Sequence, residues 1–305
     1  MGRYIARRLI QSFFVVFTVV ILVFILARMT GDPADLYLPL HATEEMREAY
    51  REAHGLDKPV LMQLAYFLLD VAKGDFGTSM WQKVPALPLV LHRLPLTLKL
   101  AGVTIVASFI VAFILGSLSA LHPLSAIDRA TTFFSLVGVT VADFWLALVL
   151  ILIFAVHLGW LPTSGTGSLK YLILPGITLA WRPLGRMAQV VRSSVLDQLS
   201  SCYVITARAK GLAEKAVIFK HVMRNAIIPV LTVAGVEFVG LANGAVIVET
   251  VFGWPGIGKL TIDALERRDF AVIQACVFVV AILVVLLNLA IDFVYAAVDP
   301  RIRYE

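Results

Sequence analysis

The sequence predicts an all-α membrane protein with six transmembrane helices and both termini in the cytoplasm. Composition, long uncharged runs and the placement of basic residues support this prediction. The chain has 305 residues, of which 59% are hydrophobic and 15% charged, and its mean hydropathy is +0.87. Soluble globular domains are only about 45–50% apolar. The excess lies in runs long enough to cross a bilayer, so a membrane protein is the class that fits.

Six segments are long and apolar enough to cross a hydrocarbon core of about 30 Å. The first lies within residues 1–29, and the others cover about 97–121, 130–157, 171–193, 225–248 and 270–294. The uncharged run in the first segment is longer than the core of a signal peptide, and no small-x-small cleavage pattern follows it. We therefore interpret it as a retained helix.

The connecting regions follow from this count. We predict an extracytoplasmic region with short helices at 30–96, a cytoplasmic segment at 200–224, an extracytoplasmic loop at 249–269 and a cytoplasmic tail at 298–305, around a transport core at 97–297. An even number of crossings puts both termini on one side. Basic residues gather at both ends and at 200–224, which the positive-inside rule assigns to the cytoplasm.

Local signals add two expectations outside the spans. Thr43 precedes a run of acidic residues and is expected to cap a short surface helix. Trp160 and Trp254 fall at predicted outer boundaries and are interpreted as aromatics of the membrane interface.

The stretch GWPGIGKLT at 253–261 differs by one residue from the phosphate-binding loop G-x-x-x-x-G-K-[ST]. Leu260 stands where the magnesium-binding hydroxyl belongs, and no parallel sheet is predicted around it. We interpret the stretch as a tight re-entrant turn, which Gly and Pro permit. The two cysteines and six histidines show no metal-ligand spacing, and nothing resembles a nucleic-acid-binding module.

Charged residues inside the predicted spans are candidate functional residues. They are Asp143, Arg182, Arg186 and Glu237. A charge in the membrane costs at least about 2.5–3.5 kcal/mol, so each should face a cavity or a partner. Two interpretations stay open: the four line the path and meet substrate charges, or they hold helices together, as an Asp143–Arg182 ion pair would. Arg186 has a further alternative, in which it snorkels to the cytoplasmic face.

Residues 203–229 read YVITARAKGLAEKAVIFKHVMRNAIIP. Two helical pieces, about 203–210 and 212–223, are expected to meet at Gly211, because glycine allows a sharp turn between helices. A basic, amphipathic helix pair that projects from a bundle suits docking into the groove of a partner. Charge alone would also fit an ordinary cytoplasmic loop.

The motif TARAKGL…HVMRNAIIP resembles the cytoplasmic coupling segment of ABC transporter permeases in the dipeptide, oligopeptide and nickel uptake branch. Similar stretches run in order from residue 4 to 303, among them FILARMTGDPADLYL, GAVIVETVFGWPGIGKL and NLAIDFVYAAVDPRIR. The resemblance implies the membrane subunit of a type I importer in the bacterial cytoplasmic (inner) membrane. Its implied partners are a second homologous permease, two cytosolic ATPases that bind ATP and Mg, and an extracytoplasmic binding protein.

The resemblance also implies which residues contact the ATPase, and it implies no catalytic residue and no cofactor in this chain. The contact residues would be Tyr203, Thr206, Ala207, Arg208, Ala209, Lys210, Gly211, Leu212, His221, Arg224 and Asn225. The small residues would bring the backbone close to the ATPase groove, and the basic residues would meet its polar rim. Two departures stand out: Ile205 replaces the usual Arg, and Ala142 replaces the Pro of a Pro-x-Phe motif. We expect one lost charged contact and a missing or displaced kink.

The substrate that the resemblance implies is a di- or oligopeptide, with nickel or a metal chelate as the alternative. An intramembrane protease would need a catalytic pair such as Asp143 and Asp292, but these lie at different predicted depths without a glycine-flanked catalytic context. A self-contained secondary transporter would be expected to show inverted repeats. The two halves of this sequence show no such similarity.

Overall fold

A computed structural model describes residues 2–29, 42–53 and 57–298. Within these ranges every regular element is a helix, apart from an isolated bridge between Thr78 and Pro85. The predicted all-α class is therefore confirmed. The described residues form two compact units, the first comprising those up to Pro95 and Gly256–Leu286, the second Leu96–Pro255 and the described residues after Leu286.

Several helices are suited to crossing a membrane. Four are long and apolar enough: Ile10–Met29, Ala86–Leu121, Glu214–Ala242 and Phe270–Phe293. A fifth crossing is possible through the bent pair Ala126–Thr140 and Asp143–His157. The remaining expected span forms α8 (Lys170–Leu199), whose 30 residues reach about 45 Å but are less apolar. The six-span count and the cytoplasmic termini stay predictions, and residues 30–41 and 299–305 lie outside the described ranges.

The first unit contains α1 (Gly2–Met29), α3 (Glu44–Ala53), α4 (Val60–Lys73), α13 (Ile257–Glu266) and the first parts of α5 (Ala86–Leu121) and α14 (Phe270–Val298). The predicted surface helix is α3, and the Thr43 hydroxyl accepts a hydrogen bond from the Met46 amide at 3.4 Å. In the core of this unit the buried Ser79 hydroxyl donates to the Asp269 carboxylate at 2.6 Å. This bond fastens the segment before α5 to the start of α14.

The stretch that resembles a phosphate-binding loop forms a turn and the start of a helix. Gly253 has φ +60°, in the left-handed region, and α13 begins at Ile257. Lys259 therefore lies inside a helix, where its Nζ pairs with Asp263 one turn later at 2.8 Å. A lysine held in this way does not face a cradle of backbone amides, so the geometry differs from that of a phosphate-binding loop.

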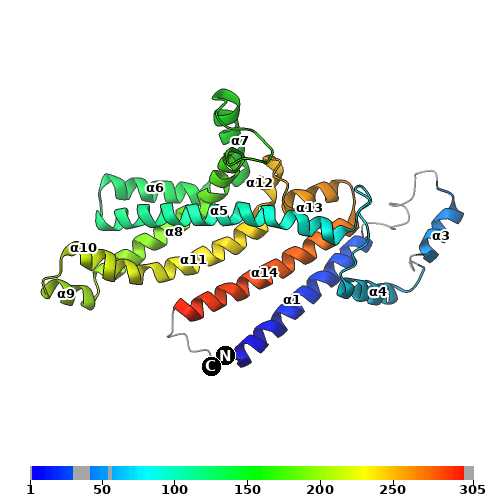
Figure 1. Ribbon diagram of the computed structural model, residues 1–305, viewed down its shortest axis with the longest axis horizontal. Helices are drawn as coiled ribbons and strands as arrows, with labels where there is room; N and C mark the ends of the chain where they lie inside the picture. The colour runs from blue at the N-terminus through cyan, green and yellow to red at the C-terminus, as the bar shows by residue number, and fades with distance from the viewer. Residues whose placement is uncertain (1, 30–41, 54–56, 299–305) are drawn as a thin grey trace. The chain divides into compact units, whose positions relative to one another are not determined.

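The second unit is a helical bundle built around α8 (Figure 1). α8 packs against α6 (Ala126–Thr140) and α11 (Met223–Gly244), and α5 runs beside them. The short helices α9 (Cys202–Ala209) and α10 (Glu214–Ala216), followed by a π-helical stretch Val217–Val222, lie at one end. α7 (Asp143–Leu150) and α12 (Val246–Val251) lie at the other end. Trp254 is buried here and donates to the Leu96 carbonyl at 3.1 Å, so its predicted interfacial position is wrong.

Two glycines let α6 and α8 approach closely. A Cβ on Gly185 of α8 would lie 2.7 Å from the Ser135 carbonyl oxygen, and a Cβ on Gly138 of α6 would lie 2.8 Å from that of Trp181. Small residues at helix crossings are typical of membrane bundles, because backbone contact there replaces the missing hydrophobic driving force. The reciprocal arrangement fixes the crossing point of the two helices.

The predicted third span is broken rather than continuous. α6 ends at Thr140, and the chain then bends by 108° before α7 begins at Asp143. A π-helix over Ile151–His157 extends α7. Val141 and Ala142 connect the two helices in extended backbone, with ψ 131° and 133°. The expectation of a missing or displaced kink is therefore wrong, because two extended residues make the bend without proline.

Candidate functional site

All the charges predicted inside the membrane segments line one pocket in the second unit. The pocket has a volume of about 290 Å³ and lies between α7, α8 and α11. Its charged lining is Asp143 from α7, Arg182 and Arg186 from α8, and Glu237 from α11. Asp143 lies in the first turn of α7, where the helix dipole favours a carboxylate. The bend after α6 is what directs this first turn toward α8, so the break in the third span helps to build the pocket.

One ion pair crosses the pocket, and it differs from the expected one. Arg186 Nη1 donates to Glu237 Oε1 at 2.8 Å, which joins α8 to α11. Asp143 and Arg182, the expected partners, form no ion pair with each other in the described structure. Arg186 is thus held by a carboxylate, and the snorkelling alternative stays a prediction. Asp292, the partner that a protease mechanism would require, is not among the lining residues.

The predicted helix pair forms α9 and α10, and the turn between them contains Gly211. Gly211 has φ +77°, the left-handed conformation, and a Cβ added to it would meet no atom within 4 Å. Glycine is therefore favoured here by the backbone conformation of the turn. No other described part of this chain packs against the position where a side chain would lie. Across the turn, the Arg208 guanidinium donates two hydrogen bonds to Glu214, at 3.1 and 2.6 Å. This exposed pair holds the two helices in one orientation.

The residues predicted to contact an ATPase divide into exposed and buried positions. Ala207 faces inward, where it packs in one cluster with Val204, Val217 and Val222. Its small size serves this internal contact, which removes it from the expected docking face. Tyr203 and His221 are half-buried, and the Tyr203 hydroxyl donates to Gln198 at 2.8 Å. The exposed predicted residues are Thr206, Arg208, Ala209, Lys210, Gly211, Leu212, Arg224 and Asn225.

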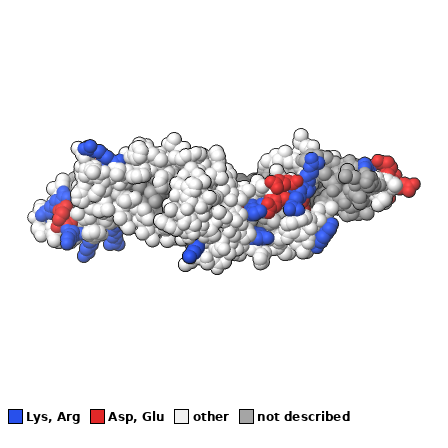
Figure 2. Space-filling view, turned by 90° about the horizontal axis from the view of Figure 1, so that it is seen from above, with Lys and Arg blue, Asp and Glu red and all other residues white. Residues whose placement is uncertain are grey.

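Apolar side chains are exposed on α9, at the turn that follows it and on the π-helical stretch Val217–Val222. Ile205, Leu212 and Phe219 are 60%, 44% and 72% exposed. Exposed apolar side chains beside basic ones are typical of a protein interface. Figure 2 shows several Lys and Arg side chains at one end of the molecule, with further ones elsewhere on the visible face. The sequence prediction missed Phe219 and treated Ile205 only as a lost charge.

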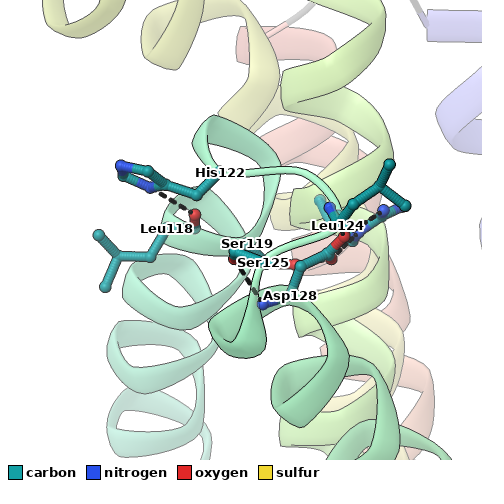
Figure 3. A network of polar contacts seen from close by, with 7 residues as sticks. Leu118, Ser119, His122, Leu124, Ser125 and Asp128 are labelled. Atoms are coloured by element: carbon teal, nitrogen blue, oxygen red, sulfur yellow. Dashed lines mark hydrogen bonds and ion pairs between the residues drawn. The ribbon is translucent and has the colours of Figure 1, made fainter.

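A buried polar network fastens the base of α6 to α8, close to the helix pair (Figure 3). Arg192 donates from Nε and Nη2 to the two carboxylate oxygens of Asp128, at 2.7 and 3.0 Å. The same carboxylate accepts bonds from the Ser119 hydroxyl at 2.5 Å and the Leu124 amide at 2.9 Å. Ser125 caps α6 by accepting from the Asp128 amide at 3.2 Å. The prediction missed Asp128, because its partner is 64 residues away along the chain.

The fold, the charged pocket and the projecting basic helix pair are those expected of a polytopic membrane transport protein. Within the described residues, no three His, Cys, Asp or Glu side chains are grouped so as to hold a metal ion. Two family models cover the sequence. The model described as "Binding-protein-dependent transport system inner membrane component" matches residues 112–304, and the model of its N-terminal region matches residues 1–101.

The chain therefore belongs to the family of binding-protein-dependent transport system inner membrane components. It is 39% identical to the oligopeptide transport system permease protein AppB of Bacillus subtilis (strain 168), over the full length of both chains. It is 39% identical to a probable peptide ABC transporter permease of Sinorhizobium fredii and 38% identical to the glutathione transport system permease GsiC of Escherichia coli (strain K12), again over full lengths. The resemblance to ABC permeases of the peptide branch is confirmed, as is a multi-pass location in the inner membrane.

Solved structures share the fold. A structure of the MetNI methionine ABC transporter matches with a TM-score of 0.57 and 17% identity, covering 69% of this chain and 96% of the other. An amino acid ABC transporter with histidines matches with a TM-score of 0.56 and 16% identity, covering 69% and 94%. The type I importer permease fold predicted from the sequence is thus supported by structural similarity.

Proposed function

We propose that this chain is the membrane-spanning permease subunit of an ABC importer that carries di- or oligopeptides across the bacterial cytoplasmic membrane. The observation that carries the proposal is the projecting α9–α10 pair, which combines exposed basic and apolar side chains at one end of the bundle. The names of full-length relatives, which describe oligopeptide, peptide and glutathione permeases, support peptides as the substrate class.

Separate subunits supply the energy. The partners in this proposal are a second homologous permease, two cytosolic ATPases that bind ATP and Mg, and an extracytoplasmic substrate-binding protein. The family description, which includes the words "binding-protein-dependent", supports the last of these. The chain itself is proposed to have no ATPase site, in keeping with Lys259 being paired inside α13.

The ATPase docks on residues 200–224 in this proposal. Leu212 and Phe219 enter its groove, while Arg208 and Lys210 meet the polar rim. The remaining contacts come from the exposed residues around the turn, and Ala207 and Val204 support the pair from behind. A short amphipathic helix that places an apolar face in a groove is a common mode of protein recognition.

The orientation follows from this docking site. If α9 and α10 face the cytoplasm, the α5–α6 corner faces it too, and α7 and α12 lie toward the outside. The position of α12 (Val246–Val251) agrees with the start of an extracytoplasmic loop at 249–269; this loop and the cytoplasmic termini are kept here as proposals. The pocket lined by Asp143, Arg182, Arg186 and Glu237 then belongs to the substrate path.

Transport results from coupling rather than covalent chemistry in this chain. ATP binding closes the ATPase pair and moves the docked helices about the Gly211 turn. The bundle then changes between inward- and outward-facing states. An ATPase can shift this equilibrium only as far as its binding free energy differs between the two states.

The direct test is uptake by proteoliposomes that contain the purified importer. The expected result is peptide accumulation that requires ATP, the ATPase subunits and the loaded binding protein. The control is an ATPase whose phosphate-binding lysine has been replaced, in which accumulation should stop. Peptide accumulation by this chain without an ATPase would contradict the proposal and favour a self-contained carrier.

A further inference from the structure

The pocket between α7, α8 and α11 carries balanced charges, two guanidinium groups and two carboxylates. Arg186 and Glu237 neutralise one another across 2.8 Å. Asp143 and Arg182 face the same pocket and interact electrostatically, but no ion pair within 4.0 Å forms on either residue in the described structure. Opposite charges that are left unpaired in a membrane protein are costly unless water or a ligand meets them. The pocket therefore offers one positive and one negative group that are not held in a direct ion pair.

We propose that this pocket binds the charged ends of a zwitterionic peptide, with Arg182 on the carboxylate and Asp143 on the ammonium group. The inference rests on the proposed function and deepens it, because it assigns the two ends of the substrate to two side chains. A guanidinium matches a carboxylate with two parallel hydrogen bonds, which makes arginine the preferred partner. Asp143 accepts the bonds that the three N–H groups of an ammonium donate.

Arg186 and Glu237 shape the selectivity of this site. Arg186 lies one helical turn after Arg182 on the same face of α8. Because Glu237 already accepts from Arg186, it is not the partner of the substrate ammonium group. The pair adds no net charge, so the pocket stays neutral overall. A neutral pocket with separated charges favours a zwitterion over a simple anion or cation.

The volume of the pocket and its charges further restrict the class of ligand that it can bind. A volume of about 290 Å³ lies at the lower limit of typical ligand pockets, about 300–1,000 Å³. The pocket suits a dipeptide, or the end of a longer peptide. A bare divalent cation such as nickel would need several ligating side chains, and within the described residues no three His, Cys, Asp or Glu side chains are grouped so as to hold one. The same chemistry thus separates the peptide from the metal-ion alternative.

The test is equilibrium binding of radiolabelled alanyl-alanine to the purified permease–ATPase complex without the binding protein. Omitting the binding protein removes its own selectivity from the measurement. The free dipeptide is compared with its C-terminal amide and with its N-acetylated form. Wild-type complex is expected to bind the free dipeptide about tenfold or more tightly than either blocked form, since each lost contact is a charge-assisted bond.

Substitutions in the pocket test which side chain binds which end of the peptide. In Arg182→Gln the difference between free dipeptide and amide should disappear, while the difference from the acetylated form remains. In Asp143→Asn the opposite pattern is expected. Lys170→Gln removes an exposed charge from the same helix outside the pocket and should bind like wild type.

Two results would overturn the inference: no saturable binding to the wild-type complex, or variants that keep the wild-type preference among the three peptides. Either result, combined with ATP-dependent peptide uptake by the complete importer, would remove the zwitterion site and leave the proposed function standing. Failure of uptake in the wild type would instead contradict the proposed function. The two failures are therefore distinguishable.

Discussion

Arg192 on α8 donates hydrogen bonds to both carboxylate oxygens of Asp128 on α6, at 2.7 and 3.0 Å. This contact lies near the end of α8 that leads into α9. Asp128 is 4% exposed, and Ser119 and the Leu124 amide complete its hydrogen bonds. The α5–α6 corner is thereby fastened to α8, seven residues before α8 ends. Motion that reaches α8 from the helix pair is expected to carry this corner with it.

Asp128→Asn should weaken this connection. The variant keeps the shape of the side chain but loses the negative charge that two guanidinium N–H groups require. Removing one member of a buried pair leaves the other unsatisfied, so the thermal midpoint of the detergent-purified protein should fall by several degrees. Asp197→Asn makes the same change at an exposed position of α8, is the matched control and should melt like wild type. An unchanged midpoint for Asp128→Asn would show that the pair carries no stability.

Gly185→Ala tests the close crossing of α6 and α8. The new Cβ would lie 2.7 Å from the Ser135 carbonyl oxygen, so the helices must separate. Overpacking of this kind typically costs about 1–3 kcal/mol. Gly102→Ala on α5, where a Cβ meets nothing within 4 Å, should be neutral or slightly stabilising because alanine favours helices. Thermal melting of both variants is the measurement, and equal midpoints would contradict the packing argument.

Two substitutions at Gly211 separate its possible roles. Asn tolerates the left-handed conformation, whereas a β-branched Val in that conformation is strained. If the turn alone matters, Gly211→Asn should couple ATP hydrolysis to uptake almost normally. An importer that contains the Gly211→Val permease should still hydrolyse ATP, but its peptide uptake should be reduced about tenfold or more.

If the ATPase groove also contacts the backbone at Gly211 directly, the side chain of Gly211→Asn will block that contact. Uptake will then be uncoupled from ATP hydrolysis in this variant as well. The measurement is the ratio of peptide imported to ATP hydrolysed in proteoliposomes. Wild-type coupling in Gly211→Val would contradict any role of this turn in docking.

Phe219→Ser removes the most exposed apolar side chain of the helix pair. Apolar anchors at the centre of an interface commonly contribute 2 kcal/mol or more, so ATPase affinity should fall about thirtyfold. Melting of the isolated permease should not change, because the ring packs on little within this chain. Leu61→Ser, which is 80% exposed in α4, is the matched control. Equal ATPase retention by both variants would remove Phe219 from the interface.

The sequence was sufficient for the class, the helix pair and the choice of pocket residues. Runs of uncharged residues identify membrane helices because the bilayer excludes charge, and the same rule singled out Asp143, Arg182, Arg186 and Glu237. Gly211 was identified because so few residues adopt its backbone conformation.

Pairing was harder to predict than position. The predicted ion pair was Asp143–Arg182, whereas the structure pairs Arg186 with Glu237. Which side chains meet depends on how α8 and α11 are rotated about their axes, and the sequence does not give this rotation. Asp128 and Arg192 were missed for the same reason, and nothing in the sequence indicated that Ala207, predicted to contact the ATPase, is buried in the cluster with Val204. The bend at Ala142 shows that the absence of proline does not ensure a straight helix.

The central claim is that residues 200–224 receive the ATPase. A photo-crosslinking amino acid placed at Leu212, in membranes that express the complete importer, tests it most directly. The account predicts a crosslink to an ATP-binding subunit, absent when the same amino acid is placed at Leu61. Crosslinking only to lipid or to the binding protein would put this segment elsewhere and contradict the account.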